Sequence, residues 1–126
     1  MQKDNNGKLI FEGEYLNGLR NGKGKEYLFG KLKFEGEYLN GKRNGKGKEY
    51  DKGNLIFEGE YLNGKKEGKG KEYMFIYRYH QLIYEGEFSN GKRNGYGREY
   101  DFDNGLIFEG KFLKGNHWNG RGIFSK

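Results

Sequence analysis

The chain has 126 residues and a formal net charge of +6, and it contains 24 Gly, 11 Tyr and 10 Phe but no Pro and no Cys. This length predicts one domain, and the lack of Cys excludes a disulfide framework or a thiolate zinc site. We expect neither a transmembrane helix nor a signal peptide, because no stretch is apolar enough. The many aromatic rings argue against disorder, and a Cys-free chain fits an intracellular, cytoplasmic location.

A short motif of an aromatic residue, Glu and Gly recurs along the chain and defines a repeat. It begins at Phe11, Phe34, Phe57, Tyr84 and Phe108. Each copy continues into a glycine segment, Gly-x-x-x-Gly-x-Gly, which the fifth copy lengthens by one residue. We therefore predict a single repeat array over residues 1–126, with units at approximately 9–31, 32–54, 55–81, 82–105 and 106–126.

Each unit is predicted to form one β-hairpin. In the first unit, residues 9–16 alternate between two faces, with Phe11 and Tyr15 on the same side. A loop at 17–21 carries Asn-Gly pairs, which tolerate the positive φ of hairpin turns, and residues 22–27 form the second arm. Frequent Gly makes helices unfavourable. The predicted fold is all-β: a single-layer, elongated, twisted antiparallel sheet of about ten strands, made of consecutive hairpins.

The register of each hairpin decides which ring packs on which glycine. We expect Asn17 to lie opposite Gly22, so that the Tyr15 ring covers the bare backbone of Gly24. The same register places Glu14 opposite Lys25 as an exposed ion pair. Ring-on-glycine packing between successive hairpins, without a second layer, is then the main source of stability.

The connection between the third and fourth units departs from the pattern. After Tyr73, residues 74–83 form a connection that is four residues longer than the matching ones and contains no Gly. Two interpretations remain open. The segment is either a protruding hairpin that binds a partner, or a pair of lengthened strands that shield the sheet.

The fifth unit is also altered. Lys111 replaces an acidic residue, and the single Trp of the chain, Trp118, lies in a lengthened loop. Terminal repeats are often atypical because they cap the array, so Trp118 is either a cap or a partner contact. No Pro blocks the edge strands, which leaves homodimerisation or assembly through open edge strands as a hypothesis.

The pattern Phe/Tyr-Glu-Gly-Glu-Tyr/Phe-x-x-Gly-x-x-x-Gly-x-Gly resembles the MORN repeat (membrane occupation and recognition nexus) and recurs over most of the chain. The resemblance implies a solenoid-like single twisted antiparallel sheet with one hairpin per repeat. It also implies an accessory role, because MORN arrays act as scaffolds, as protein-docking modules and, in some proposals, as phospholipid binders.

These features predict a non-catalytic scaffold or adaptor that binds a protein partner, in association with the cytoskeleton or a membrane surface. The expected binding surface is the aromatic face of the sheet or the long central hairpin. The candidate partner-binding residues are Tyr15, Tyr38, Tyr61, Phe88, Phe75, Tyr77, Tyr79 and Trp118.

The loops between the two arms of each hairpin are predicted to form a basic edge. The candidate anion- or lipid-binding residues are Arg20, Lys42, Arg43, Lys65, Lys66, Lys92 and Arg93. An alternative function is therefore a peripheral membrane module that binds anionic phospholipid, although the same charges also serve solubility. Nucleic acid is the least favoured partner, because rings packed against Gly provide no stacking platform.

Side chains for catalysis are scarce. Ser occurs only at Ser89 and Ser125, and His only at His80 and His117, too few for a Ser/His/Asp set or a His-based metal site. Segments of the form Gly-x-x-x-x-Gly-Lys imitate a phosphate loop, but Arg or Lys follows where Ser or Thr should bind magnesium. We therefore predict no enzymatic activity, no cofactor and no metal.

Overall fold

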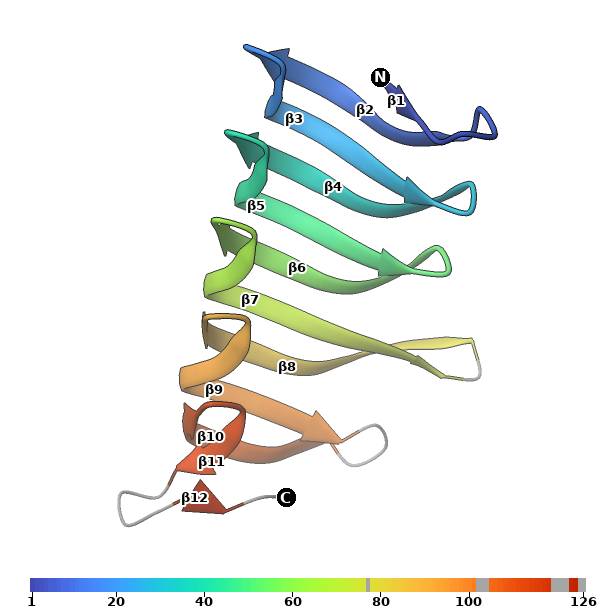
Figure 1. Ribbon diagram of the computed structural model, residues 1–126. Coiled ribbons are helices and arrows are strands. Elements are labelled where there is room, and N and C mark those ends of the chain that lie inside the picture. The colour runs from blue at the N-terminus through green and yellow to red at the C-terminus, as the bar shows by residue number, and fades with distance from the viewer. Residues whose placement is uncertain (77, 102–104, 119–122, 125–126) are drawn as a thin grey trace. The chain divides into compact units, whose positions relative to one another are not determined.

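The computed structural model describes residues 1–76, 78–101, 105–118 and 123–124, and all regular secondary structure in these ranges is β-strand (Figure 1). The strands are β1 (Gln2–Lys3), β2 (Leu9–Leu16), β3 (Leu19–Leu28), β4 (Lys31–Leu39), β5 (Lys42–Asp51), β6 (Asn54–Leu62), β7 (Lys65–Ile76), β8 (Tyr79–Ser89), β9 (Lys92–Asp101), β10 (Gly105–Leu113), β11 (Asn116–Trp118) and β12 (Ile123–Phe124). A helix long and apolar enough to cross a membrane is absent from these ranges.

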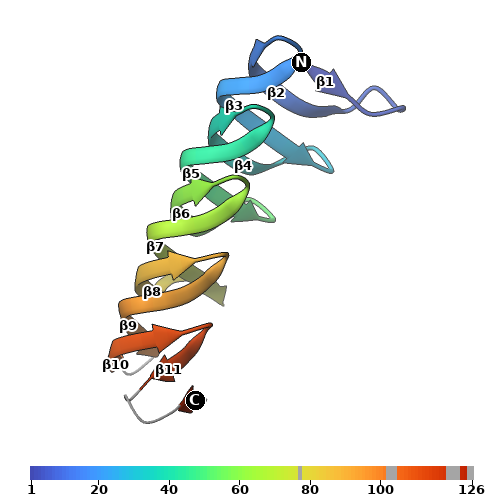
Figure 2. The same ribbon diagram turned by 60° about the vertical axis from the view of Figure 1, so that its left-hand side comes forward.

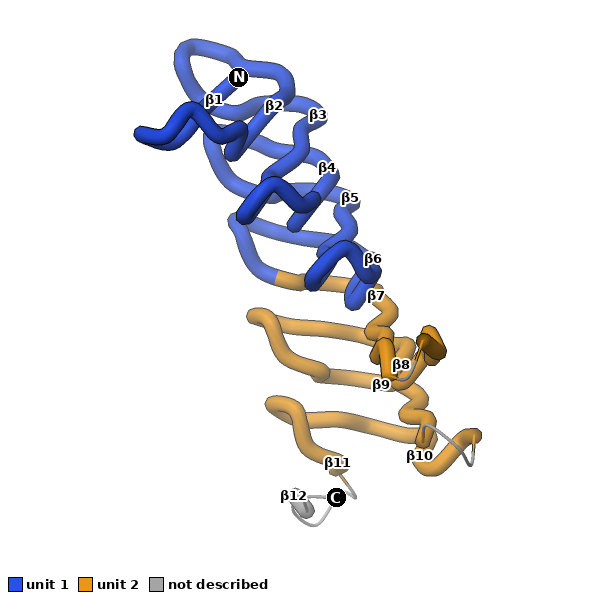
Figure 3. The backbone as a smooth tube through the Cα atoms, turned by 90° about the vertical axis from the view of Figure 1, so that its right-hand side faces the viewer, with its two compact units in different colours: residues 1–65 blue, residues 66–126 orange. Residues whose placement is uncertain are grey.

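The chain divides into two compact units, residues 1–65 and 66–126, and each is a single layer of antiparallel strands (Figures 2 and 3). In the first unit β1 to β6 follow one another in sequence order, and in the second β7 to β12 do so. Consecutive strands within each layer pair antiparallel where the pairing is described. The predicted all-β fold of consecutive hairpins is therefore confirmed.

Each repeat hairpin closes with a two-residue turn, so the predicted five-residue loop is wrong. Asn17 and Gly18 both have positive φ, 52° and 81°, which is the type I′ geometry that matches the twist of paired strands. β3 consequently begins at Leu19, which lies opposite Leu16. Turns with the same signs of φ recur at Asn40–Gly41, Asn63–Gly64, Asn90–Gly91 and Lys114–Gly115.

The predicted pairing of Tyr15 with Gly24 is wrong. Gly13 lies opposite Gly24, and Tyr15 lies opposite Arg20. Because neither glycine has a side chain, the Phe11 ring lies across the pair, and a Cβ added to Gly24 would collide with this ring. Ring-on-glycine packing is therefore present, with Phe11 as the ring in place of Tyr15.

A β-bulge between the two arms accounts for the shift of register. Gly22 in the second arm has a φ of +98°, a conformation that favours glycine. Beside it, the Glu14 carboxylate accepts a hydrogen bond from the Lys23 backbone amide at 3.2 Å. The predicted opposition of Glu14 and Lys25 is wrong, since Lys25 lies opposite Glu12.

The core of each unit is a row of aromatic rings on one face of the sheet. In the first unit Phe11, Phe34 and Phe57 are fully buried, and Tyr38 and Tyr61 are 4% exposed. Neighbouring rings meet edge to face, as in the 5.2 Å contact between the Phe34 and Tyr61 ring centroids, which is a favourable aromatic geometry. The corresponding buried rings of the second unit are Tyr84, Phe88 and Phe112.

The other face of the sheet carries rows of Glu and Lys. Lys25 of β3 lies opposite both Glu12 of β2 and Glu35 of β4, an arrangement of charges that stabilises neighbouring strands modestly. On this face the Tyr50 hydroxyl donates a hydrogen bond to Glu35 at 2.6 Å. Burial and this hydrogen bond raise the pKa of Tyr50 to about 12. The polar face therefore contributes cross-strand pairing, while the aromatic face supplies the core.

Candidate interaction surfaces

A row of cationic side chains lies over the aromatic core. The Arg20 guanidinium lies 4.1 Å from the centre of the Phe11 ring, and that of Arg43 lies 4.0 Å from the centre of the Phe34 ring. Arg93 makes the same kind of contact in the second unit. Each contact contributes about 0.5–2 kcal/mol. Because these residues belong to strands β3, β5 and β9, their predicted position in loops is wrong.

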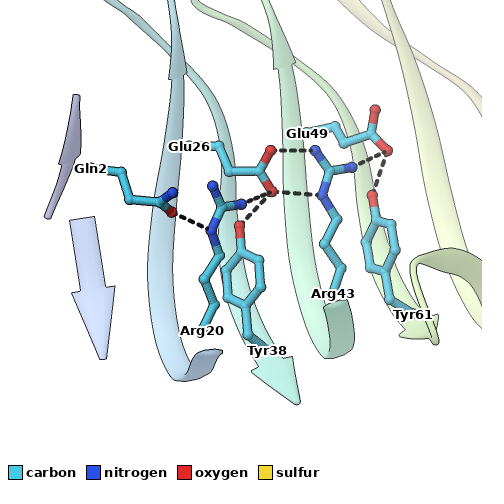
Figure 4. Close-up of polar contacts among 7 residues, drawn as sticks. All are labelled: Gln2, Arg20, Glu26, Tyr38, Arg43, Glu49 and Tyr61. Carbon is cyan, nitrogen blue, oxygen red and sulfur yellow. Dashed lines mark hydrogen bonds and ion pairs between the residues drawn. The ribbon is translucent and has the colours of Figure 1, made fainter. Parts of the chain in front are cut away.

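Carboxylates hold these guanidinium groups in place (Figure 4). Glu26 accepts hydrogen bonds from the Tyr38 hydroxyl at 2.5 Å and from Arg43 Nε at 2.9 Å. Arg43 also lies 3.5 Å from Glu49, which accepts a hydrogen bond from the Tyr61 hydroxyl at 2.6 Å. Arg, Glu and Tyr side chains of successive hairpins thus form a polar layer above the rings of the first unit.

The polar layer uses different side chains in the first and last repeats. At the start of the chain, Gln2 accepts a hydrogen bond from Arg20 Nε at 2.9 Å, in the role that Glu26 has for the next repeat. In the fifth repeat, His117 stands where the first, second and fourth repeats have Arg and the third has Lys66. Its ring stacks on Phe108 with centroids 3.7 Å apart, and its Nε2 lies 2.6 Å from a Glu99 carboxylate oxygen.

The contacts of Glu26 determine its protonation state. Burial alone would raise the pKa of Glu26, but the hydrogen bonds from Arg43 and Tyr38, together with the positive charges of Arg43 and Arg20, outweigh burial and lower this pKa below its usual value. Burial and the bond to Glu26 raise the pKa of Tyr38. At neutral pH the Glu26 carboxylate is therefore charged and accepts hydrogen bonds, while the Tyr38 hydroxyl is protonated and donates one to it.

We expect the Glu26→Gln variant to be about 1.5 kcal/mol less stable at neutral pH, because it loses hydrogen bonds to a charged acceptor. The folded-state pKa of Glu26 is lowered, so its contribution is present above the unfolded pKa and is lost as pH falls through the folded pKa. Urea unfolding at about pH 7 and about pH 3 tests this expectation. The wild type should lose more stability than the variant between these two pH values, and equal losses would contradict the assigned role.

Three of the predicted partner-binding rings belong to the core. Tyr38, Tyr61 and Phe88 are each 4% exposed, so a partner cannot reach their rings without displacing the layer above them. Tyr15, at the same repeat position in the first hairpin, is 39% exposed. Trp118 is half-buried on β11.

The long hairpin β7–β8 carries the other predicted aromatic residues. Its strands remain paired as far as Ile76 and Tyr79. Met74 is 40% exposed, Phe75 42% and Tyr79 68%, while Tyr77 lies outside the described residues. The pairing of the lengthened strands agrees with one of the two interpretations left open by the sequence. Their exposed apolar side chains are compatible with the other, a hairpin that binds a partner.

The predicted basic residues fall into two groups. Those directly after the turns are exposed: Lys42, Lys65 and Lys92. Those one position further along are half-buried: Arg20, Arg43, Lys66 and Arg93. The first group is therefore the more accessible to an anion.

A row of exposed leucines, which the sequence reasoning missed, lies at the turns of the first unit. Leu16, Leu39 and Leu62 each precede an Asn-Gly turn and are 57%, 49% and 52% exposed. Lys42 lies opposite Leu39 across one of these turns. We call this set, with Lys42 and Lys65, the Leu–Lys edge; it is both apolar and basic. The sequence feature that could have predicted this edge is the Leu that precedes Asn-Gly in each of the first three repeats.

Within the residues that the structure describes, His, Asp and Glu side chains form no group of three that could hold a metal ion. Successive hairpins of one repeated sequence, with buried rings and exposed turns, define a β-hairpin repeat protein.

The family model of the MORN repeat matches residues 11–28, 34–54, 57–74 and 84–106, more than half of the chain, and the chain therefore belongs to the MORN repeat family. A search of curated proteins found no match. MORN repeats are in general modules that interact with proteins or membranes, and the repeat type is non-enzymatic.

Proposed function

We propose that the chain is a scaffold that binds a protein partner through the tip of the β7–β8 hairpin, formed by Met74, Phe75, Ile76, Tyr79 and His80. The observation that carries this proposal is the exposure of Met74, Phe75 and Tyr79 on strands that remain paired. Exposed apolar patches on soluble proteins mark interaction sites, and Met and aromatic residues are enriched in protein interfaces.

The contacts within the tip support its use as a preformed binding element. Phe75 lies opposite His80, and Ile76 lies opposite Tyr79. The His80 ring stacks on Tyr73 with centroids 4.7 Å apart. An element that is already ordered loses less conformational entropy when a partner binds.

The scaffold is proposed to be non-catalytic and cytoplasmic, beside the cytoskeleton or a membrane surface. The non-enzymatic nature of the repeat type supports the first part. The lack of Cys supports a reducing compartment.

Replacing residues 74–81 with Asp-Lys-Gly-Asn, the sequence of residues 51–54, should abolish partner binding and preserve the fold. The two connections are interchangeable because Tyr50 and Tyr73, which precede them, lie opposite equivalent Leu residues. Quantitative affinity purification with the wild-type and grafted chains measures partner binding, and circular dichroism checks the fold.

A charge-reversal variant, Lys42→Glu with Lys65→Glu, provides the control for this experiment. It changes exposed residues that are not part of the tip and should keep the partners that the graft loses. An unchanged set of partners after grafting would contradict a role for the tip.

A peripheral membrane module is the second candidate function, and the Leu–Lys edge favours it. Each Lys near an anionic membrane surface contributes about 1 kcal/mol, and the exposed leucines add apolar area that the headgroup region can bury. Lys42 and Leu39 lie opposite each other in this edge, so charge and apolar surface would meet the membrane together.

Co-sedimentation with vesicles of phosphatidylserine and phosphatidylcholine tests the membrane candidate. Binding should be strong in dilute buffer and weak at high salt, because surface charges are screened. The paired variant Leu39→Ser with Leu62→Ser should reduce binding without changing the net charge. Absence of sedimentation even in dilute buffer would exclude this candidate.

A further inference from the structure

The second unit carries a row of Tyr, Lys and Trp side chains across three strands. Tyr96 of β9 lies opposite Lys111 of β10, which lies opposite Trp118 of β11. Residues opposite each other in paired strands share a face of the sheet. Phe112 and His117, which alternate with the members of this row, are buried in the aromatic core, so the row lies on the polar face. Tyr96 is 64% exposed, Lys111 is exposed and Trp118 is half-buried.

We propose that this set, the Tyr–Lys–Trp row, binds a single-stranded nucleic acid. One base stacks on Tyr96 and another on Trp118, and the phosphate between them contacts Lys111. Exposed aromatic side chains on a β-sheet, with cationic groups beside them, are a recurrent means of holding unpaired bases. This inference concerns other residues than the hairpin tip and does not rest on the proposed function.

The row departs from the repeat pattern in both charge and shape. The first three repeats have Lys at the position of Tyr96, and the first four have Glu at the position of Lys111. In the first unit these positions pair opposite charges, as Lys23 does with Glu37 and Lys46 with Glu60. At the equivalent place in the second unit, Lys replaces the acid and Tyr replaces the base. The balanced pair has thus become a cation beside aromatic rings.

The positive charge of Lys111 is available to a phosphate. Its Nζ lies 5.3 Å from the centre of the Tyr96 ring, a cation–π contact. In the neighbouring row, Arg98 Nε lies 2.6 Å from a Glu109 carboxylate oxygen, so these two charges compensate each other. Among the described residues, no carboxylate lies within ion-pair distance of Lys111. An anionic ligand therefore complements the row.

The spacing of the two rings suits two separate bases. Adjacent strands lie about 4.8 Å apart, so the backbones of Tyr96 and Trp118 are roughly 10 Å apart. This distance leaves room for a base on each ring, with Lys111 between them. The strand that carries Tyr96 is also fixed, because the Tyr96 amide donates a hydrogen bond to a Glu87 carboxylate oxygen at 2.7 Å. A platform that is already ordered loses less conformational entropy on binding.

The platform consists of other rings than those considered in the sequence. The argument against nucleic acid concerned rings packed on glycine, such as Phe34 on Gly47. Tyr96 and Trp118 point to the opposite face and leave stacking surface exposed. The chain's formal net charge of +6 also favours encounter with a polyanion.

Binding should be selective for single strands. A base inside a duplex is stacked and paired, so it cannot lie on an aromatic side chain without being extruded. Little preference among base sequences is expected, because every base has a stacking face.

Titration of the full chain with an oligothymidylate of about 12 nucleotides tests the proposal. Trp118 is the only Trp in the sequence, so its fluorescence reports directly from the row. Saturable quenching is expected with the single strand, and much weaker binding with a duplex of the same length. Fluorescence anisotropy of a labelled oligonucleotide measures the affinity of each variant, and circular dichroism checks its fold.

Two pairs of variants separate stacking from charge. Tyr96→Leu should weaken binding about fivefold or more, through loss of one stacked base, whereas Phe29→Leu removes an 84% exposed ring outside the row and should have no effect. Lys111→Gln should reduce the slope of log Kd against log salt concentration by about 0.7, the value for one phosphate contact. Lys46→Gln removes an exposed Lys of the first unit and should leave the slope unchanged.

Four results would overturn the proposal. They are an absence of quenching in dilute buffer, wild-type affinity of Tyr96→Leu, and equal affinity for the duplex. The fourth is an equal change of slope in Lys46→Gln and Lys111→Gln, because binding would then follow overall charge and not the row.

Discussion

Phe34→Ala is expected to lower the free energy of unfolding by about 3–5 kcal/mol. The Phe34 side chain is fully buried, and its ring meets Tyr38 and Tyr61 edge to face at centroid distances of 5.7 and 5.2 Å. The Arg43 guanidinium lies 4.0 Å from the ring centre. Removing the ring deletes these contacts and leaves a cavity that the neighbours fill only in part. Urea unfolding followed by circular dichroism measures the loss.

The matched control is Leu39→Ala. Leu39 belongs to the same strand but is 49% exposed, so its truncation should change stability by no more than about 0.5 kcal/mol. If Phe34→Ala also fell within about 0.5 kcal/mol of the wild type, the ring row could not be the core of the first unit.

The fold could be predicted from the sequence because its main signals are local and repeated. The motif that starts at Phe11 and at each later copy fixes where a hairpin begins, and alternation along residues 9–16 distinguishes strand from helix. The sequence contains no Val and no Ala to form a thick interior. A single layer held together by aromatic rings packed on glycines was therefore the expected fold.

The turn and the register could not be predicted, because two Asn-Gly pairs lie close together. Asn17–Gly18 and Asn21–Gly22 are equally suited to positive φ. In the structure the first pair forms the turn and Gly22 lies at the bulge, with φ +98°. This choice is made by the long-range contact of the Phe11 ring with the glycines beneath it, which no local pattern contains.

The candidate surfaces were predicted only in part for a related reason. A row of Tyr on an alternating strand predicts one exposed ring face, but Arg43 and its equivalents cover that face from the next strand. These Arg residues are the second residue after each turn. Their place over the rings could not be predicted without knowing which Asn-Gly pair forms the turn. His117 has the same position after Lys114–Gly115, and it too was missed.

Gly47→Ala is expected to destabilise the fold by about 1–3 kcal/mol through overpacking, although Ala normally suits a strand better than Gly. A Cβ at position 47 would lie 2.6 Å from Cε1 of Phe34 and 3.1 Å from Cε1 of Tyr61. The Phe34 ring cannot retreat, because Arg43 covers its other side. Urea unfolding of the variant measures the cost.

Combining Gly47→Ala with Phe34→Leu tests whether the ring is the cause. Leu lacks the ring atoms that the new Cβ meets, so the double variant should be more stable than the sum of the single effects by about 1 kcal/mol or more. Lys48→Ala, at the next and exposed position, should cost less than about 0.5 kcal/mol. Additive effects of the two core substitutions would mean that the glycine is required for a reason other than the ring above it.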